Sequence, residues 1–125
     1  MRGNQAKKPA KDGHRYVIVI PEAGPMYPEM LDDGVRAVCR KVLGARRVDA
    51  VPCGMDARFT VLFSLDVTTD LYNPAASRLA QERLSGPCVV ARGGRDDGLR
   101  GLSREGVKKA IADLTAMAAE GIGDV

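Results

Sequence analysis

The pattern of hydrophobic and polar positions changes abruptly at Tyr16. Residues 1–14 are rich in Lys, Gly and Pro and contain little that is apolar, which predicts a basic, flexible N-terminal tail. Tyr16–Ile20 is a continuous and mostly β-branched run, typical of a strand whose two faces are both covered. Periodic apolar positions continue from there, so we expect a single domain over residues 15–120 and a frayed C-terminus at residues 121–125.

A long helical pattern follows the first strand. Between Pro28 and Leu43 apolar side chains recur every three or four residues, with acidic residues in the first turns and basic residues in the last, as the helix dipole favours. Gly44 offers a stop, and Gly34 inside the helix is expected to cost about 1 kcal/mol relative to Ala. The apolar stripe consists of Leu31, Val35, Val38, Cys39 and Val42.

Two strands are expected next, at residues 46–51 and 58–67, joined by a short turn that contains Gly54. A short connection of this kind predicts a hairpin. Every second residue of the later strand is apolar, which places these side chains on one face and leads us to expect helices on a single side of the sheet. That face consists of Phe59, Val61, Phe63, Leu65 and Val67.

The segment from residue 73 to residue 91 contains signals for a helix and then a strand. Asn73 is a favourable N-cap, and Pro74 is a favourable first helical residue because its missing N–H costs nothing there. Ser85-Gly86-Pro87 should end the helix, and Cys88–Ala91 should form a short buried strand.

The last helix should begin after Ser103, which can serve as its N-cap, with Glu105 in its first turn. The element order is therefore β-α-β-β-α-β-α. This order predicts an α+β fold in one compact domain, with about four mainly antiparallel or mixed strands backed by three helices.

The formal net charge of +3 is unevenly distributed. Residues 1–15 hold five basic and one acidic side chain, a net +4, so the remaining residues hold −1. The folded part is nearly neutral and shows no evident basic stripe of the kind found on nucleic-acid-binding folds. Nucleic acid stays an alternative partner through the tail, and its candidate contacts are Lys7, Lys8, Lys11 and Arg15.

The residues needed for catalysis are sparse. General acid–base and nucleophilic mechanisms need a group that titrates near neutrality beside a reacting group, and the sole histidine, His14, lies in the tail. Cys39, Cys53 and Cys88 are spaced too widely and irregularly for a zinc site. Two pairs of adjacent aspartates have structural explanations and leave magnesium binding as an alternative. We therefore expect a protein that is not an enzyme and that has no cofactor or metal ion.

The same features bear on location. The N-terminus is charged and has no apolar segment typical of a secretion signal, and no apolar run approaches the length of a membrane helix. We expect a cytoplasmic protein with reduced thiols and no contact with a membrane.

A glycine-rich loop at residues 92–101 is the candidate binding site. It contains Arg92, Arg95 and Arg100, whose guanidinium groups suit phosphates, carboxylates or a partner protein. It lacks the Lys-Ser/Thr ending of a phosphate-binding loop. Tyr72 either lines a groove and contacts a ligand or partner, or belongs to the core.

Several of these motifs resemble a family of small uncharacterised bacterial and phage proteins found in mobile elements. The resemblance covers roughly residues 16–116. The family usually has an Arg where Pro74 stands, and it implies a mobile-element setting without a particular activity. The resemblance rests on Tyr16–Ile20, Arg47–Pro52, Asn73-Pro74-Ala75-Ala76, Leu84–Val90 and Leu102–Glu105.

The leading hypothesis is a non-enzymatic binding protein of a phage or mobile element that occupies a partner protein, as an inhibitor in counter-defence or host takeover. One alternative is a nucleic-acid-binding accessory protein that uses the basic tail and the Arg/Gly loop. Another is a binder of a small phosphorylated or nucleotide-like ligand.

Overall fold

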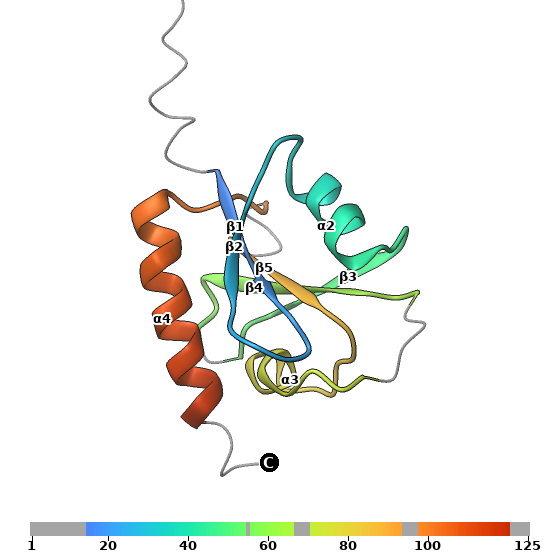
Figure 1. Ribbon diagram of the computed structural model, residues 1–125, viewed down its shortest axis with the longest axis vertical. Coiled ribbons are helices and arrows are strands. Elements are labelled where there is room, and N and C mark those ends of the chain that lie inside the picture. The colour runs from blue at the N-terminus through green and yellow to red at the C-terminus, as the bar shows by residue number, and fades with distance from the viewer. Residues whose placement is uncertain (1–14, 55, 67–70, 94–97, 121–125) are drawn as a thin grey trace, which may run out of the picture.

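The computed structural model describes residues 15–54, 56–66, 71–93 and 98–120. Within these ranges the chain forms one open sheet of five antiparallel strands with three helices (Figure 1). The predicted α+β class is confirmed, with five strands in place of about four and no mixed pairing among them. The predicted tail and the predicted frayed C-terminus lie outside the described residues. The elements are β1 (Tyr16–Ile20), β2 (Tyr27–Met30), α2 (Val35–Leu43), β3 (Val48–Pro52), β4 (Phe59–Ser64), α3 (Pro74–Ala80), β5 (Cys88–Arg92) and α4 (Arg104–Glu120), and the order across the sheet is β2-β1-β5-β4-β3.

The helix predicted over residues 28–43 is wrong in its first half. This part of the chain is the edge strand β2, paired with β1 in a register that places Pro28 opposite Ile18. Gly34 stands just before α2 with φ 94°, a conformation that glycine adopts at little cost. The chain therefore turns at Gly34, where the prediction continued the helix.

Packing explains why the helical spacing crossed this break. Leu31 reaches the same hydrophobic cluster as Val35, although it directly follows β2 and lies outside the helix. The acidic residues expected in the first turn of the helix precede it instead. The end of the helix is as predicted, with Arg40 and Lys41 in the last turn and Gly44 in the left-handed conformation.

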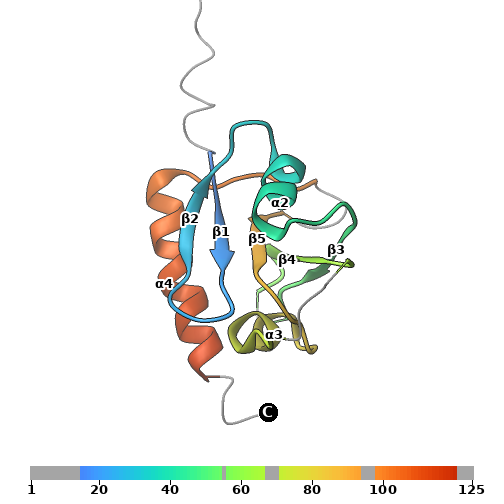
Figure 2. The same ribbon diagram turned by 45° about the vertical axis from the view of Figure 1, so that its right-hand side comes forward.

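Helices cover both faces of the sheet, which corrects the expectation of a single covered side. Helix α2 packs on one face, called here the α2 face, and α3 and α4 pack on the other, the α4 face (Figures 1 and 2). Neighbouring residues of β4 divide accordingly, Val61 joining the cluster of α3 and α4 and Leu62 that of α2. The second buried face of β4 was not predicted because Thr60, which lies on it, is a polar residue. It is only 5% exposed, since its hydroxyl donates to the carbonyl oxygen of Gly93 at 2.6 Å.

The other local predictions are largely confirmed. Asn73 caps α3, its Oδ1 accepting the backbone N–H of Ala76 at 3.1 Å, and Ser103 Oγ accepts a backbone N–H from the first turn of α4. Strands β3 and β4 form the expected hairpin. Helix α3 is shorter than predicted, because it ends at Ala80 with Gln81 in the left-handed conformation at φ 60°.

Both edges of the sheet offer few hydrogen-bond donors to a further strand. The registers of β1–β2 and β3–β4 turn the backbones of Pro28 and Pro52 away from the neighbouring strand, and proline has no N–H to present there. On β3, the outward N–H of Ala50 donates to Asp49 Oδ1 at 2.8 Å. Strand addition at either edge is therefore disfavoured.

Candidate functional site

The structure places two arginines of the predicted loop side by side at the end of β5. Arg92 is the last residue of β5, and its backbone N–H and carbonyl oxygen both bond to Arg100, at 2.9 Å in each direction. Both residues are exposed. Arg95 lies outside the described residues.

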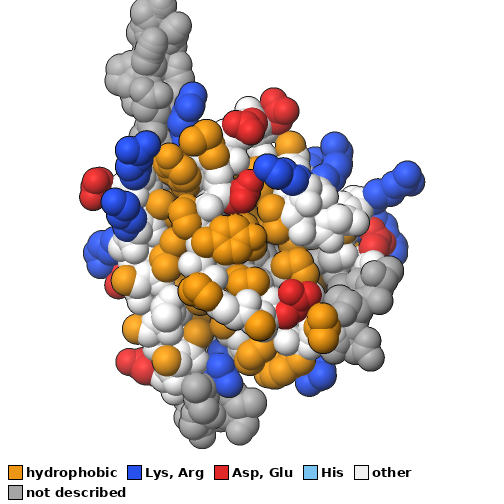
Figure 3. Space-filling view, viewed as in Figure 1, with side chains coloured by type: hydrophobic (Ala, Val, Ile, Leu, Met, Phe, Trp, Pro, Cys, Tyr) orange, Lys and Arg blue, Asp and Glu red, His pale blue; other side chains and the backbone are white. Residues whose placement is uncertain are grey.

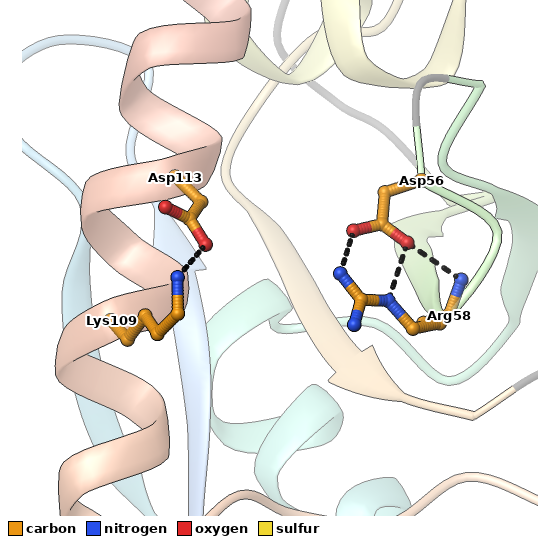
Figure 4. A network of polar contacts seen from close by, with 4 residues as sticks. All are labelled: Asp56, Arg58, Lys109 and Asp113. Carbon is orange, nitrogen blue, oxygen red and sulfur yellow. Dashed lines mark hydrogen bonds and ion pairs between the residues drawn. The ribbon is translucent and has the colours of Figure 1, made fainter.

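A charged network of four residues lies on the α4 face, close to this end of the sheet (Figure 4). In the turn before β4, Arg58 donates to both carboxylate oxygens of Asp56, from Nε at 2.9 Å and from Nη2 at 2.7 Å. On α4, Lys109 donates to Asp113 at 2.9 Å. The hydrogen bonds from Arg58, with a smaller effect of the charge on Arg92, lower the pKa of Asp56. Each cation of the network thus has a carboxylate, which leaves little attraction for an outside anion.

The structure describes two of the remaining predicted contact residues, Tyr72 and Arg15. Tyr72 is half-buried, and its ring centre lies 4.5 Å from the guanidinium carbon of Arg83, a cation–π contact that accounts for its position. Arg15 is exposed just before β1, and its carbonyl oxygen accepts the N–H of Leu31 at 2.6 Å. The tail residues Lys7, Lys8 and Lys11 lie outside the described residues.

A concave site that the sequence reasoning missed lies on the α2 face, between α2 and the β3–β4 hairpin. Its volume is about 590 Å³, within the range of ligand sites. Apolar side chains form its floor, four arginines line it, and no acidic residue does. We call this site the arginine pocket. The arginines are Arg36, Arg40, Arg46 and Arg47, and the floor includes Val35, Cys39, Leu62, Leu65 and Leu99.

The fold explains how these arginines come together. Arg36 and Arg40 are four residues apart on α2, so they lie one turn apart on the same side of the helix. Gly44 ends α2 with φ 65° and turns the chain toward β3. Arg46 and Arg47 follow this turn, and all four arginines are exposed.

Asp66, just after β4, fixes the second pair of arginines. Its Oδ2 accepts the backbone N–H groups of Arg46 and Arg47 at 3.1 and 2.9 Å, and its Oδ1 accepts Arg47 Nε at 2.8 Å. These bonds, led by the backbone N–H of Arg47, hold the pKa of Asp66 below its usual range. Asp66 therefore already occupies these two amides and Arg47 Nε, so Arg36, Arg40 and Arg46 carry most of the net positive charge at this rim.

The floor gives the pocket an apolar component. Leu65 is 49% exposed, and Leu99 reaches the floor from the loop that the sequence singled out for its arginines. Cys39 is buried, and loss of hydration raises the pKa of its thiol to about 11, so the thiol stays protonated at neutral pH. The pocket therefore combines positive charge with hydrophobic contact and lacks a nucleophile.

A signal for the pocket was present in the sequence. Arg36 and Arg40 have helical i, i+4 spacing, and Arg46-Arg47 follows the glycine that ends the same helix. The net charge of the whole folded part is close to zero, so it did not reveal that four arginines lie near one another.

Comparison with protein-family models, with curated proteins and with solved structures found no match. In the part of the chain that the structure describes, no three His, Cys, Asp or Glu side chains are grouped so as to hold a metal ion. No helix in those ranges has the length and apolar character needed to cross a membrane.

Proposed function

We propose that this protein is a non-enzymatic binding protein that occupies an acidic surface of a partner protein with its arginine pocket. The observation that carries the proposal is the set of four exposed arginines around an apolar floor with no acidic residue in the lining. Arginine is enriched among the residues that dominate protein–protein affinity, and apolar contacts supply the rest of such sites.

The charge distribution supports an acidic partner. The chain after residue 15 carries a net charge of −1, yet four arginines line one site of the α2 face, and Arg47 alone among them is described in an ion pair, with Asp66. A local positive potential of this kind speeds the association of a negatively charged surface and orients it before contact.

The combination of exposed guanidinium groups with an apolar floor supports a protein partner over a small molecule at this pocket. Small-ligand sites enclose most of the ligand and present a few buried polar groups to it. Here all four arginines are exposed, and the buried lining residues are apolar or the protonated thiol of Cys39. A partner protein can cover such a rim, and the proline-bearing edges favour a face over strand addition.

Because the sequence resembles proteins of mobile elements, we also propose that the protein acts in a phage or another mobile element. A small protein that occupies an acidic surface can block the nucleic-acid or protein contacts of a host factor without chemistry of its own. We place the protein among the inhibitors used in counter-defence or host takeover.

The test compares the wild-type protein with Arg36→Ala/Arg40→Ala. Lys108→Ala/Lys109→Ala on α4 is the matched control, since it also removes two exposed cations. Each purified protein is first checked for an unchanged melting temperature and then used to capture proteins from a bacterial lysate. We expect one near-stoichiometric acidic partner with the wild type and the control. Affinity for the purified partner should fall by about tenfold or more in the pocket variant, as for hot-spot arginines.

Equal affinity of the pocket variant and the wild type would refute the role of the pocket. Failure to capture any partner, together with a nucleotide-induced rise in melting temperature that the pocket variant loses, would instead favour the small-ligand alternative. Recovery of nucleic acid in place of a protein would favour the nucleic-acid alternative.

A further inference from the structure

Arg92 and Arg100, called here the arginine pair, face one another across an isolated antiparallel bridge. Each donates its backbone N–H to the carbonyl oxygen of the other, at 2.9 Å in both directions. In a hydrogen-bonded pair of this kind the two side chains leave the backbone on the same face, with Cα atoms roughly 5.5 Å apart. The two guanidinium groups therefore share one side of the sheet.

The backbone beneath the pair is closely held. Gly93 follows Arg92 with φ 109°, and a Cβ at this position would collide with the carbonyl oxygen of Gly98. The N–H of Gly93 donates to the backbone carbonyl oxygen of Arg58 at 2.8 Å. The carbonyl oxygen of Gly93 accepts a hydrogen bond from the hydroxyl of Thr60. These contacts fix the base of the loop, and with it the spacing of the pair.

The pair lies on the α4 face, opposite the arginine pocket. Val90 belongs to the cluster of α3 and α4 and Ala91 to that of α2, so the alternation of β5 directs Arg92 toward the α4 face. Asp56 is close enough to feel the charge of Arg92, but its carboxylate oxygens are bonded to Arg58. Within the described ranges, neither guanidinium of the pair takes part in a hydrogen bond or a salt bridge.

Like charges directly opposite one another destabilise a strand pair, so a bound anion would relieve a cost that is built into this bridge. Guanidinium groups form paired hydrogen bonds with oxyanions, and a phosphate monoester has three free oxygens and close to two charges to share between them. We propose that the arginine pair binds the phosphate group of a phosphate monoester. The site is separate from the arginine pocket and does not depend on the partner proposed for it.

The experiment follows the arginine Nε–Hε signals of the full-length protein by NMR during titration with inorganic phosphate. Sodium chloride at matched ionic strength controls for screening. We expect saturable shifts of the Arg92 and Arg100 signals with phosphate and with adenosine monophosphate. Affinity should fall at least tenfold in Arg100→Gln and stay unchanged in Arg83→Gln, which removes an exposed guanidinium outside both proposed sites. Arg100→Lys keeps the positive charge but loses the paired N–H donors of the guanidinium, so its phosphate affinity should lie between those of the wild type and Arg100→Gln.

Three results would overturn the proposal. The first is a shift that is linear and equal with chloride, which would show screening alone. The second is saturable binding that persists in Arg100→Gln, or that moves only the signals of the arginine pocket. The third is binding of a short oligonucleotide without any binding of inorganic phosphate or adenosine monophosphate, which would assign the pair to phosphodiesters.

Discussion

The side-chain amide of Asn73 donates to the carbonyl oxygen of Ile20 at 2.9 Å and so ties the start of α3 to the end of β1. The same amide nitrogen donates to Gly86 at 2.9 Å, while Oδ1 caps the helix through Ala76. Asn73 is fully buried. One side chain therefore joins three segments that are far apart in the sequence, which is a larger role than the helix cap that the sequence predicted.

Replacement of Asn73 tests this role. Asn73→Ala should lower the free energy of unfolding by about 3 kcal/mol, since it removes the cap and leaves two buried carbonyl oxygens without donors. Asn73→Asp keeps the cap oxygen but sets a carboxylate against those carbonyl oxygens, so it should be destabilised at least as much. Urea unfolding of the three proteins measures the difference. A wild-type stability for Asn73→Asp would show that only the cap matters.

The edge strand β3 should pair with β3 of other molecules when Asp49 and Pro52, which limit its free N–H groups, are replaced. Asp49→Ala/Pro52→Thr frees the N–H of Ala50 and adds an N–H at position 52, both on the outer side of the strand. We expect self-association that increases with protein concentration, measured by light scattering after gel filtration. Pro25→Thr, in an exposed bend, is the control for loss of a proline. A variant that elutes like the wild type at all concentrations would contradict this account of the edge.

Acid should destabilise the protein through Asp56 and Asp66. Hydrogen bonds from Arg58 and from Arg47 lower the pKa of these two carboxyl groups in the folded state, below the ordinary value of 3.8. Their contribution is therefore complete above that value and is lost as the pH falls through the lower folded pKa. Asp66→Asn should be less stable than the wild type at neutral pH, with a smaller further loss on acidification. Parallel stability curves against pH would contradict the prediction.

The thiols should react only when the protein opens. Burial raises the pKa of Cys88 to about 12, helped by the charge of Glu22, so its thiolate fraction at pH 8 is on the order of 10⁻⁴. Cys39 and Cys53 are buried as well. We expect labelling by a disulfide reagent at a rate that follows the rate of unfolding and all three thiols to react at once in urea. Fast labelling of one cysteine in the folded protein would contradict this.

Figure 3 shows one side of the molecule, with apolar side chains gathered over its middle and charged ones mainly at its margin. Features that depend on only a few neighbouring residues could be predicted from the sequence. Asn73, Gly44 and Ser103 end or begin helices through their own backbone and side-chain chemistry, so their roles follow from local sequence. Contacts between distant segments could not be predicted, because they depend on which face of the sheet each residue packs against. Leu31 has the spacing of a helical position only because it reaches the cluster of α2 from the segment just after β2.

The features of the fold and of the proposed binding surfaces divide in the same way. The sequence by itself determined the α+β class, most of the strands, the helix caps at Asn73, Gly44 and Ser103 and the scarcity of catalytic groups, because these follow from periodicity, capping and composition. Only the tertiary structure decided that α2 covers a second face, that Arg36 and Arg40 meet Arg46 and Arg47 around one pocket, and that Arg92 and Arg100 share the opposite face. The physical reason is that a charge acts over distances in space, and the chain fold alone sets which charges lie within reach of one another.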